Sequence, residues 1–332
     1  MKKDLEHPSR NFGKTGVLII NLGTPDSTSW LDIRKYLKEF LSDRRVIEVN
    51  PIIWQIILNV FILNLRPSKT AKAYKEIWMK EENISPLLYY TKKQAEKLSI
   101  LISKENLVVD YAMRYGNPSI RNKIKTLHEM GCENLVILPL YPQYAAATTA
   151  TVCDEVYRTL MKMTWQPSLK IIPHYESDPL YIEALVNSLN KKIKEIKWKP
   201  DLILASYHGI PQKYFDKGDP YHCYCHKTTR LIKEKFNKVE IQTTFQSRFG
   251  PQEWLTPYTD KTLEELPKKG IKNLLVICPG FASDCVETLE EIDIQGRESF
   301  LKNGGENFDL IPCLNDSSDH IGLFQELVKK YL

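Results

Sequence analysis

NLLVICPGFASDCVETLEEIDIQGR, from Asn273 to Arg297, is the most informative segment of this chain for its fold. It begins with LLVIC, an unbroken apolar run whose length suits a strand that is buried on both faces of a parallel sheet. A Pro-Gly pair ends this strand, and Ser283 or Asp284 then offers a side-chain oxygen that can cap a helix. A buried strand followed at once by a helix predicts an α/β fold.

Three acids stand on this expected helix. Asp284, Glu287 and Glu291 are three and then four residues apart, so their carboxylates share one face of an α-helix. Acids near the start of a helix also complement its dipole and often do no more than face water. These acids, however, follow the carboxyl end of a buried strand, where open α/β sheets bind ligands. They are therefore candidates for a site.

Length and composition exclude several classes of protein. The 332 residues are enough for two domains, and 42% hydrophobic with 26% charged residues is typical of globular proteins. The net charge of +5 is modest and lysines alternate with acids, so no nucleic-acid partner is expected. Seven cysteines do not fit a secreted disulfide framework, and the basic N-terminus lacks the apolar core of a signal peptide. We expect a cytoplasmic protein with disordered residues 1–15.

Further apolar runs alternate with helix-length segments along the chain, which is typical of parallel βαβ units. One expected helix covers Trp30–Phe40. The strand-like runs are Gly16–Asn21, Asn106–Asp110, Asn134–Leu140, Leu169–Pro173 and residues 202–208.

The two halves of the chain also resemble each other. GCENLVILPLYPQYAAATT from Gly131 matches GIKNLLVICPGFASDCVET from Gly270, and VLIINLGTP from Val17 matches LILASYHGIP from Leu202. Such a repeat predicts two similar Rossmann-like domains, residues 16–178 and 179–332, each a parallel sheet flanked by helices. A ligand cleft is expected between their facing strand ends, and the last helix is expected to pack across the interface.

The same comparison indicates where the two halves differ. The second half has His208 where the first has Gly23, and Glu287 where the first has Thr148. Shared positions describe the scaffold, whereas divergent polar positions describe chemistry. The catalytic groups are therefore expected in the second half.

Residues 51–65, PIIWQIILNVFILNL, are the most apolar window of the chain. The window is too short to span a bilayer, which needs about 20 residues. Apolar runs of such a length are usually core helices. The alternative is an apolar lip that dips into a membrane interface, because basic residues flank the window on both sides. The lip would give the protein a peripheral contact with the inner membrane.

His208 ends a strand and enters a loop held by Gly209 and Pro211. A lone histidine is commonly a satisfied structural residue. At the carboxyl edge of a sheet, facing a row of carboxylates, it can instead accept protons and help to bind a divalent cation weakly enough for release. The sequence has no GxGxxG, no GxxxxGK[ST] and no GxSxG, so it offers no dinucleotide, P-loop or serine-hydrolase site.

From about Gly16 onward the chain resembles the ferrochelatases, class II chelatases that insert Fe²⁺ into protoporphyrin IX to form protohaem in the last step of haem biosynthesis. The motifs are SYHGIP with His208, KGDPY from Lys217, FQSRFGPQEWLTPYTD from Phe245 and CPGFASDCVETLEEID from Cys278, with support from NLGTPD and PLYPQY. The resemblance implies a lyase of this type with the porphyrin clamped between two Rossmann-like domains. It implies protoporphyrin and ferrous iron as substrates and no permanent cofactor.

Position by position, the resemblance assigns catalysis and Fe²⁺ binding to His208 and Glu287. Asp284 and Glu291 are further candidates for the metal, and whether the acidic row carries metal inward or protons outward stays open. The implied substrate-binding residues are Arg114 and Tyr115 near the metal entry, Trp254 and Phe281 as aromatic walls, and Arg66, Tyr74 and Ser85 at the propionates.

The sequence departs from the family pattern at several positions. Cys285 stands where several relatives have a second histidine, and Leu22 where others have Met or Tyr. The C-terminal cysteine cluster that binds a [2Fe–2S] centre in animal members is missing, so such a centre is not expected. Cys223 and Cys225, in HCYCH, have a weak zinc spacing and are more simply explained as partly buried thiols.

Two other functions compete with this interpretation. One is a chelatase of the same fold that acts on another tetrapyrrole, such as coproporphyrin or sirohydrochlorin. The other is a non-catalytic carrier of haem or porphyrin, which would leave the acidic row without a task. The aromatic pocket residues and the apolar window favour an apolar porphyrin and an enzyme.

Overall fold

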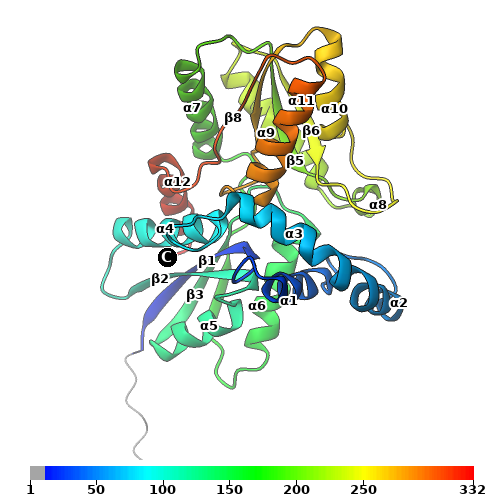
Figure 1. Cartoon of the computed structure of the whole chain (residues 1–332). Coiled ribbons are helices and arrows are strands. Elements are labelled where there is room, and N and C mark those ends of the chain that lie inside the picture. Colours follow the sequence, from blue (N-terminus) through cyan, green and yellow to red (C-terminus); the bar gives the residue numbers. More distant parts are fainter. Residues whose placement is uncertain (1–11) are drawn as a thin grey trace, which may run out of the picture.

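The computed structural model of the protein describes residues 12–332. It contains two four-stranded parallel sheets, each flanked by helices (Figure 1). The strand order is β2-β1-β3-β4 in the first sheet and β6-β5-β7-β8 in the second. Each strand of the second sheet thus takes the place of the strand four earlier in the first. This confirms the predicted α/β fold with two similar Rossmann-like halves.

Six strands coincide with the strand-like runs of the sequence, whereas β6 and β8 were not among those runs. The first sheet consists of β1 (Lys14–Thr24), β2 (Leu107–Gly116), β3 (Cys132–Pro139) and β4 (Ser168–Ile171). The second consists of β5 (Leu202–His208), β6 (Ile241–Gln246), β7 (Asn273–Ile277) and β8 (Asn307–Leu310).

The N-terminal end of β1 lies earlier than the sequence predicted. Most of the segment 1–15, expected to be disordered, lies outside the described residues. Lys14 and Thr15, however, already belong to β1, because the Lys14 N–H donates to the Gly131 carbonyl and the Thr15 N–H to the Asn106 carbonyl.

Helices connect the strands in both halves. Those of the first half are α1 (Trp30–Leu41), α2 (Pro51–Ile57), η1 (Leu58–Ile62), α3 (Leu63–Ile77), α4 (Pro86–Leu101), α5 (Ile120–Glu129), η2 (Ala146–Ala150) and α6 (Thr151–Leu160). Those of the second half are α7 (Pro179–Glu195), α8 (Gln212–Asp216), α9 (Tyr221–Lys235), α10 (Thr259–Glu265), η3 (Leu266–Lys269), η4 (Val286–Gly296), α11 (Arg297–Lys302) and α12 (Ser318–Lys329). The segments η1, η2 and η4 are π-helices, with backbone bonds from residue i to i+5.

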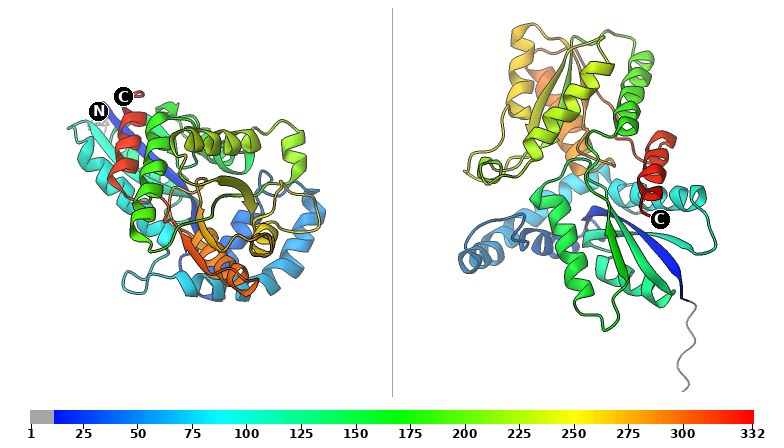
Figure 2. Two further views of the ribbon diagram at one scale, coloured as in Figure 1. Left: turned by 90° about the horizontal axis from the view of Figure 1, so that it is seen from above. Right: turned by 180° about the vertical axis from the view of Figure 1, so that it is seen from behind.

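One apolar core joins the two halves. It includes Val17 and Leu138 from the first sheet, Ile203 and Tyr207 from the second, and Phe324 from α12. The C-terminal helix α12 packs against both α4 and α7, as the views from two sides show (Figure 2). The strand ends of both sheets are therefore held at fixed positions relative to each other.

The apolar window 51–65 is not a core helix. It forms α2, η1 and the start of α3, and α2 has no buried residue. Ile52, Phe61 and Leu65 have exposed fractions of 74%, 57% and 75%. Only Leu58 and Leu63 are buried, and they fix the segment to the core around α1. The prediction that residues 51–65 form a core helix was wrong. The reason is that α2 extends past the edge of the sheet, where no described element covers it (Figure 1).

Within residues 12–332, no helix is both long and apolar enough to cross a membrane.

Candidate active site

A cavity lies between the two sheets, at the carboxyl ends of their strands. Its empty volume is about 1150 Å³, including its open mouth. The end of β1 and the loops after β3, β5 and β7 line it, which is where parallel α/β sheets bind ligands. The predicted site residues that line it are His208, Glu287, Trp254, Phe281, Tyr74 and Ser85.

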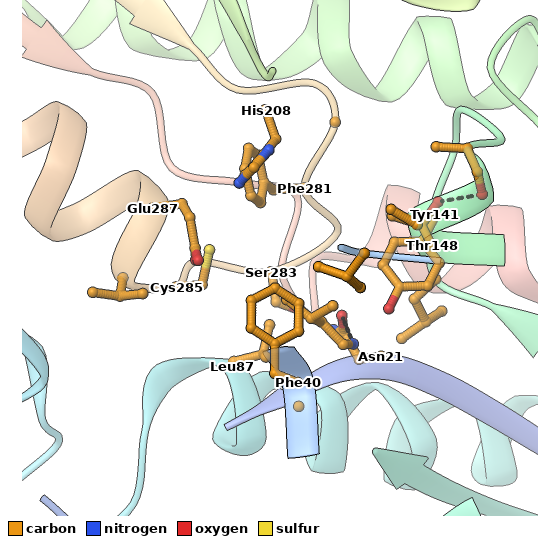
Figure 3. Close-up of a pocket in the computed structure, with 18 of the residues that line it drawn as sticks. Asn21, Phe40, Leu87, Tyr141, Thr148, His208, Phe281, Ser283, Cys285 and Glu287 are labelled. Atoms are coloured by element: carbon orange, nitrogen blue, oxygen red, sulfur yellow. Dashed lines mark hydrogen bonds between the residues drawn. The ribbon is translucent and has the colours of Figure 1, made fainter. Parts of the chain in front are cut away.

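His208 is the last residue of β5, and its imidazole points into the cavity (Figure 3). Its Nδ1 lies 2.7 Å from the Gly209 carbonyl oxygen. Because a carbonyl can only accept, Nδ1 carries the hydrogen in this contact and Nε2 keeps its lone pair when the ring is neutral. The arrangement therefore presents a proton acceptor to the cavity.

Glu287 is in the first turn of η4 and lines the cavity on the same side as His208 (Figure 3). The Cys285 thiol lies beside it, and burial together with the Glu287 carboxylate raises the pKa of Cys285 well above its usual value. Burial, and then the same carboxylate, also raise the pKa of Tyr74. The cavity thus contains one carboxylate among groups that stay protonated at neutral pH.

The predicted row of three carboxylates is not formed. Asp284 precedes η4 and is buried, and its carboxylate accepts bonds from the Asn315 amide at 2.6 Å and the Cys313 N–H at 3.1 Å. It does not cap the helix either, since the N-cap is Cys285, whose N–H donates to Thr288 Oγ1 at 3.0 Å. Asp284 is a structural acid that fixes the loop before the helix.

Glu291 borders a different cavity, of about 900 Å³, together with Ser247, Asp260 and Gln295. The Ser247 N–H donates to its carboxylate at 2.8 Å, and the Ser247 hydroxyl donates as well. Burial raises the pKa of Glu291, and the bonds from Ser247 oppose that shift. Glu291 is therefore held by Ser247 at the border of this second cavity.

The three acids differ in their partners. Asp284 precedes η4 and is bound by Cys313 and Asn315, whereas Glu291 is bound by Ser247. Glu291 still lies close enough to His208 and Glu287 for both to influence its pKa. Among residues 12–332, no group of three or more His, Cys, Asp or Glu side chains could hold a metal ion together.

Arg114 and Tyr115 do not line the cavity but lie in a buried network behind it. The Arg114 guanidinium donates to Asp43 at 2.5 Å and to the Thr151 carbonyl at 2.9 Å. The Tyr115 hydroxyl donates to the same Asp43 carboxylate at 2.9 Å. These contacts fix β2 to α6, which begins where the π-helix η2 ends, so the pair supports one wall of the cavity.

Arg66, on α3, is half-buried and lies over the Phe249 ring, 4.6 Å from its centroid. Burial lowers the pKa of Arg66, and Glu287 partly offsets that shift. No carboxylate within residues 12–332 forms an ion pair with it. Ser85 is the N-cap of α4 and accepts from the Leu88 N–H at 3.2 Å, so its hydroxyl oxygen has a structural partner.

Aromatic and apolar side chains make up most of the remaining wall. Trp254 is buried, and its indole N–H donates to the Phe249 carbonyl at 3.0 Å. Tyr141 and Gln143, which belong to the PLYPQY motif, also line the cavity. The lining residues that sequence reasoning had not singled out include Asn21, Tyr36, Phe40, Tyr141, Gln143, Tyr214 and Tyr221.

The internal repeat reappears in this site. Gly23 and Thr148, the first-half counterparts of His208 and Glu287, line the same cavity. Thr148 lies on η2, a π-helix that occupies the place of η4 in the first half. The two halves thus supply matched walls, of which only the second carries an imidazole and a carboxylate.

Cys223 and Cys225 lie on α9, away from the cavity. Cys223 is exposed, whereas Cys225 is buried, and burial raises the pKa of the Cys225 thiol well above its usual value. His222 and His226 flank them with ring centroids 4.5 Å apart. One thiol is therefore in contact with solvent, and the other lies in the protein interior.

Comparisons with known proteins show the family of the chain. The family model described as Ferrochelatase matches residues 14–332. A ferrochelatase of Allorhizobium ampelinum is 54% identical over 330 residues, which cover 98% of this chain and 96% of the relative. A ferrochelatase of Rhizobium meliloti is 53% identical over 100% of this chain and 99% of its own length. A ferrochelatase of Francisella tularensis subsp. novicida is 49% identical over 98% of both chains.

Solved structures with a similar fold are more distant in sequence. SirB from Bacillus subtilis, solved with Fe³⁺, has a TM-score of 0.58 and 12% identity, covering 96% of this chain and 95% of SirB. CbiX, described as the terminal enzyme of sirohaem biosynthesis in denitrifying bacteria, has a TM-score of 0.54 and 12% identity, covering 96% and 99%. At this identity the likeness shows the chelatase fold alone.

Proposed function

The chain belongs to the ferrochelatase family and is an enzyme that inserts ferrous iron into protoporphyrin in haem synthesis, and we propose that insertion takes place in the cavity between its halves, with His208 and Glu287 at the metal. The observation that carries this assignment is the isolation of one imidazole and one carboxylate in a cavity with aromatic walls. A flat apolar ring fits such walls, and both titratable groups line this same cavity (Figure 3).

His208 accepts the protons that the porphyrin must lose. Each pyrrole N–H has to give up its proton before the nitrogen can bind iron. The lone pair on Nε2 of His208 is available because Nδ1 donates to the Gly209 carbonyl. The imidazole then passes the proton on and returns to its neutral form.

Glu287 supplies the negative charge that the incoming cation needs. Carboxylate oxygen suits Fe²⁺, and a single carboxylate binds it weakly enough for transfer to four pyrrole nitrogens. The tyrosine and cysteine side chains around Glu287 are held protonated, so they do not compete as anionic ligands. Asp284 and Glu291 have other partners and serve the metal at most from a distance.

Arg66 is the group that receives a propionate of the ring. Its guanidinium forms no ion pair within the described chain and lies close enough to Glu287 for that carboxylate to influence its pKa. A planar fork matches a carboxylate in two parallel hydrogen bonds. Tyr74 and Ser85 line the cavity itself, whereas Arg66 does not. Arg114 and Tyr115 act from behind the wall rather than on the ring.

A chelatase for a polycarboxylate tetrapyrrole would need several cations around the ring. The described cavity instead has apolar and aromatic walls, with Arg66 as the neighbouring guanidinium. A panel of protoporphyrin, coproporphyrin and sirohydrochlorin with Fe²⁺ under anaerobic conditions tests the assignment. The highest kcat/KM is expected with protoporphyrin. A higher kcat/KM with either of the other two tetrapyrroles would overturn the assignment of protoporphyrin as the substrate. Porphyrin binding without metal insertion would identify a carrier.

The apolar lip, defined as the exposed side chains Ile52, Ile53, Ile56, Val60, Phe61 and Leu65, gives the protein a peripheral contact with a membrane. Lys69 and Lys72 follow on α3 and are exposed toward headgroup phosphates. An apolar product can leave directly into lipid from such a position. We place the protein in the cytoplasm, against the inner membrane.

A further inference from the structure

Gln246, the last residue of β6, contacts the elements that carry both proposed catalytic residues. It lies opposite His208 in the parallel pairing of β5 with β6. Its side chain is buried and lies outside the first cavity. Any effect of Gln246 on the reaction must therefore pass through its neighbours.

The backbone of Gln246 holds Gly209, whose carbonyl orients the imidazole of His208. The Gly209 N–H donates to the Gln246 carbonyl at 2.8 Å, and the Gly209 carbonyl accepts from Nδ1 of His208. A Cβ atom on Gly209 would lie 2.9 Å from the same Gln246 oxygen, so the approach leaves no room for a side chain. The orientation of the imidazole thus depends on where the end of β6 lies.

The side chain of Gln246 reaches the other catalytic element. Its Nε2 donates to the backbone carbonyl of Glu287 at 2.8 Å. Its Oε1 accepts from the Ser206 hydroxyl at 2.7 Å, which determines which end of the amide faces η4. The Ser206 hydroxyl is in turn hydrogen-bonded to the Thr259 hydroxyl, with 2.9 Å between the two oxygens. The amide is therefore locked between the sheet and the π-helix.

We propose that Gln246 is a positioning residue for metal insertion, holding Glu287 at the correct place relative to His208. The proposal rests on the proposed function, since it assumes that these two residues act on the same metal. A displacement of about 1 Å in a reacting group can cost about 100-fold in rate. Loss of the amide should therefore reduce the rate of insertion while leaving the porphyrin walls intact.

The test compares Gln246→Leu, which removes the amide, with Gln246→His, whose Nε2 can donate from a similar reach. Anaerobic kinetics with protoporphyrin and Fe²⁺ should show kcat lowered about 10- to 100-fold in Gln246→Leu. The KM for protoporphyrin should stay within about twofold, and Gln246→His should recover most of kcat. Gln242→Leu, on the same strand but outside the cavity, is the matched control and should behave as the wild type.

Ser206→Ala is a milder variant that keeps the test valid if Gln246→Leu does not fold. It frees the amide without removing it and should lower kcat about two- to tenfold. Wild-type values of kcat in Ser206→Ala and both Gln246 variants would overturn the proposal. So would a fall in kcat that is matched by lost porphyrin affinity and a lowered Tm. Failure of the wild type to form haem in the same assay would instead overturn the proposed function.

Discussion

His208 and Glu287 face one cavity from the carboxyl ends of β5 and β7, two strands that pair in the same sheet. One ends its strand directly, and the other follows on a π-helix after a short loop. Their first-half counterparts, Gly23 and Thr148, have no titratable group. Both halves of the duplicated scaffold therefore line the cavity, and the imidazole and the carboxylate both come from the second half.

Glu287 and Glu291 should have unequal roles, because they border different cavities. Glu287→Gln should lower kcat about 100-fold or more, since it removes the carboxylate that faces the metal. Glu291→Gln should lower kcat less than about tenfold and mainly raise the KM for Fe²⁺. Kinetics with iron varied at saturating porphyrin separate the two effects. Equal losses of kcat would show that the acids work as one unit.

Arg66→Ala should raise the KM for protoporphyrin about 10- to 100-fold with little change in kcat, because a charge-assisted hydrogen bond to a propionate is lost. Lys69→Ala, an exposed cation on the same helix, is the matched control. Protoporphyrin dimethyl ester has no propionate charge and should not distinguish Arg66→Ala from the wild type. An equal loss with acid and ester would assign Arg66 to packing against Phe249.

The apolar lip should bind anionic vesicles. Ile56→Glu combined with Phe61→Glu should release the protein in a co-sedimentation assay, since both side chains are exposed and their replacement leaves the core intact. Trp54 is unsuitable for this test because its indole N–H donates to the Leu41 carbonyl at 2.7 Å. Ile100→Glu with Met161→Glu, two exposed apolar residues elsewhere, should leave binding unchanged. Equal binding of both double variants to the vesicles would show that the apolar lip does not contact the membrane.

His320 should make the fold sensitive to mild acid. It is fully buried on α12, where burial lowers its pKa from 6.5 to about 4. The unfolded chain takes up the proton first, so stability is complete above pH 6.5 and falls as pH drops toward 4. The loss between pH 7.5 and pH 5 should be about 2 kcal/mol.

Urea unfolding of the wild type and of His320→Gln at pH 7.5 and pH 5 measures this change in the free energy of unfolding. The variant should show a pH dependence smaller by about the same 2 kcal/mol, because glutamine does not titrate. An unchanged pH dependence in the variant would mean that His320 takes up its proton in the folded protein.

The sequence predicted those features that depend on apolar pattern and repetition. The runs around Val17, Leu135, Leu204 and Leu275 became central strands because each is apolar throughout. The matched motifs of the two halves then indicated equal topology and a cleft at their strand ends. His208 and Glu287 were identified as the positions at which the repeat breaks.

Other features depend on backbone geometry that residue types do not reveal. The sequence placed Asp284 on one helix with Glu287 and Glu291, but η4 begins only at Val286. The partners of Asp284 and Glu291 are Asn315 and Ser247, which helix spacing could not identify. The partner of Arg114 is Asp43, 71 residues away, which spacing alone could not identify. The window 51–65 has the composition of a core helix, and only its place beyond the sheet exposes it.

The most direct test of the whole account is to mix purified wild type and His208→Ala anaerobically with protoporphyrin and Fe²⁺, following porphyrin binding by fluorescence and haem formation by absorbance. The wild type should bind protoporphyrin and form haem, whereas His208→Ala should bind it with similar affinity and form haem at least about 100-fold more slowly. Haem formation by His208→Ala at a rate near that of the wild type would contradict the placement of metal insertion at this imidazole.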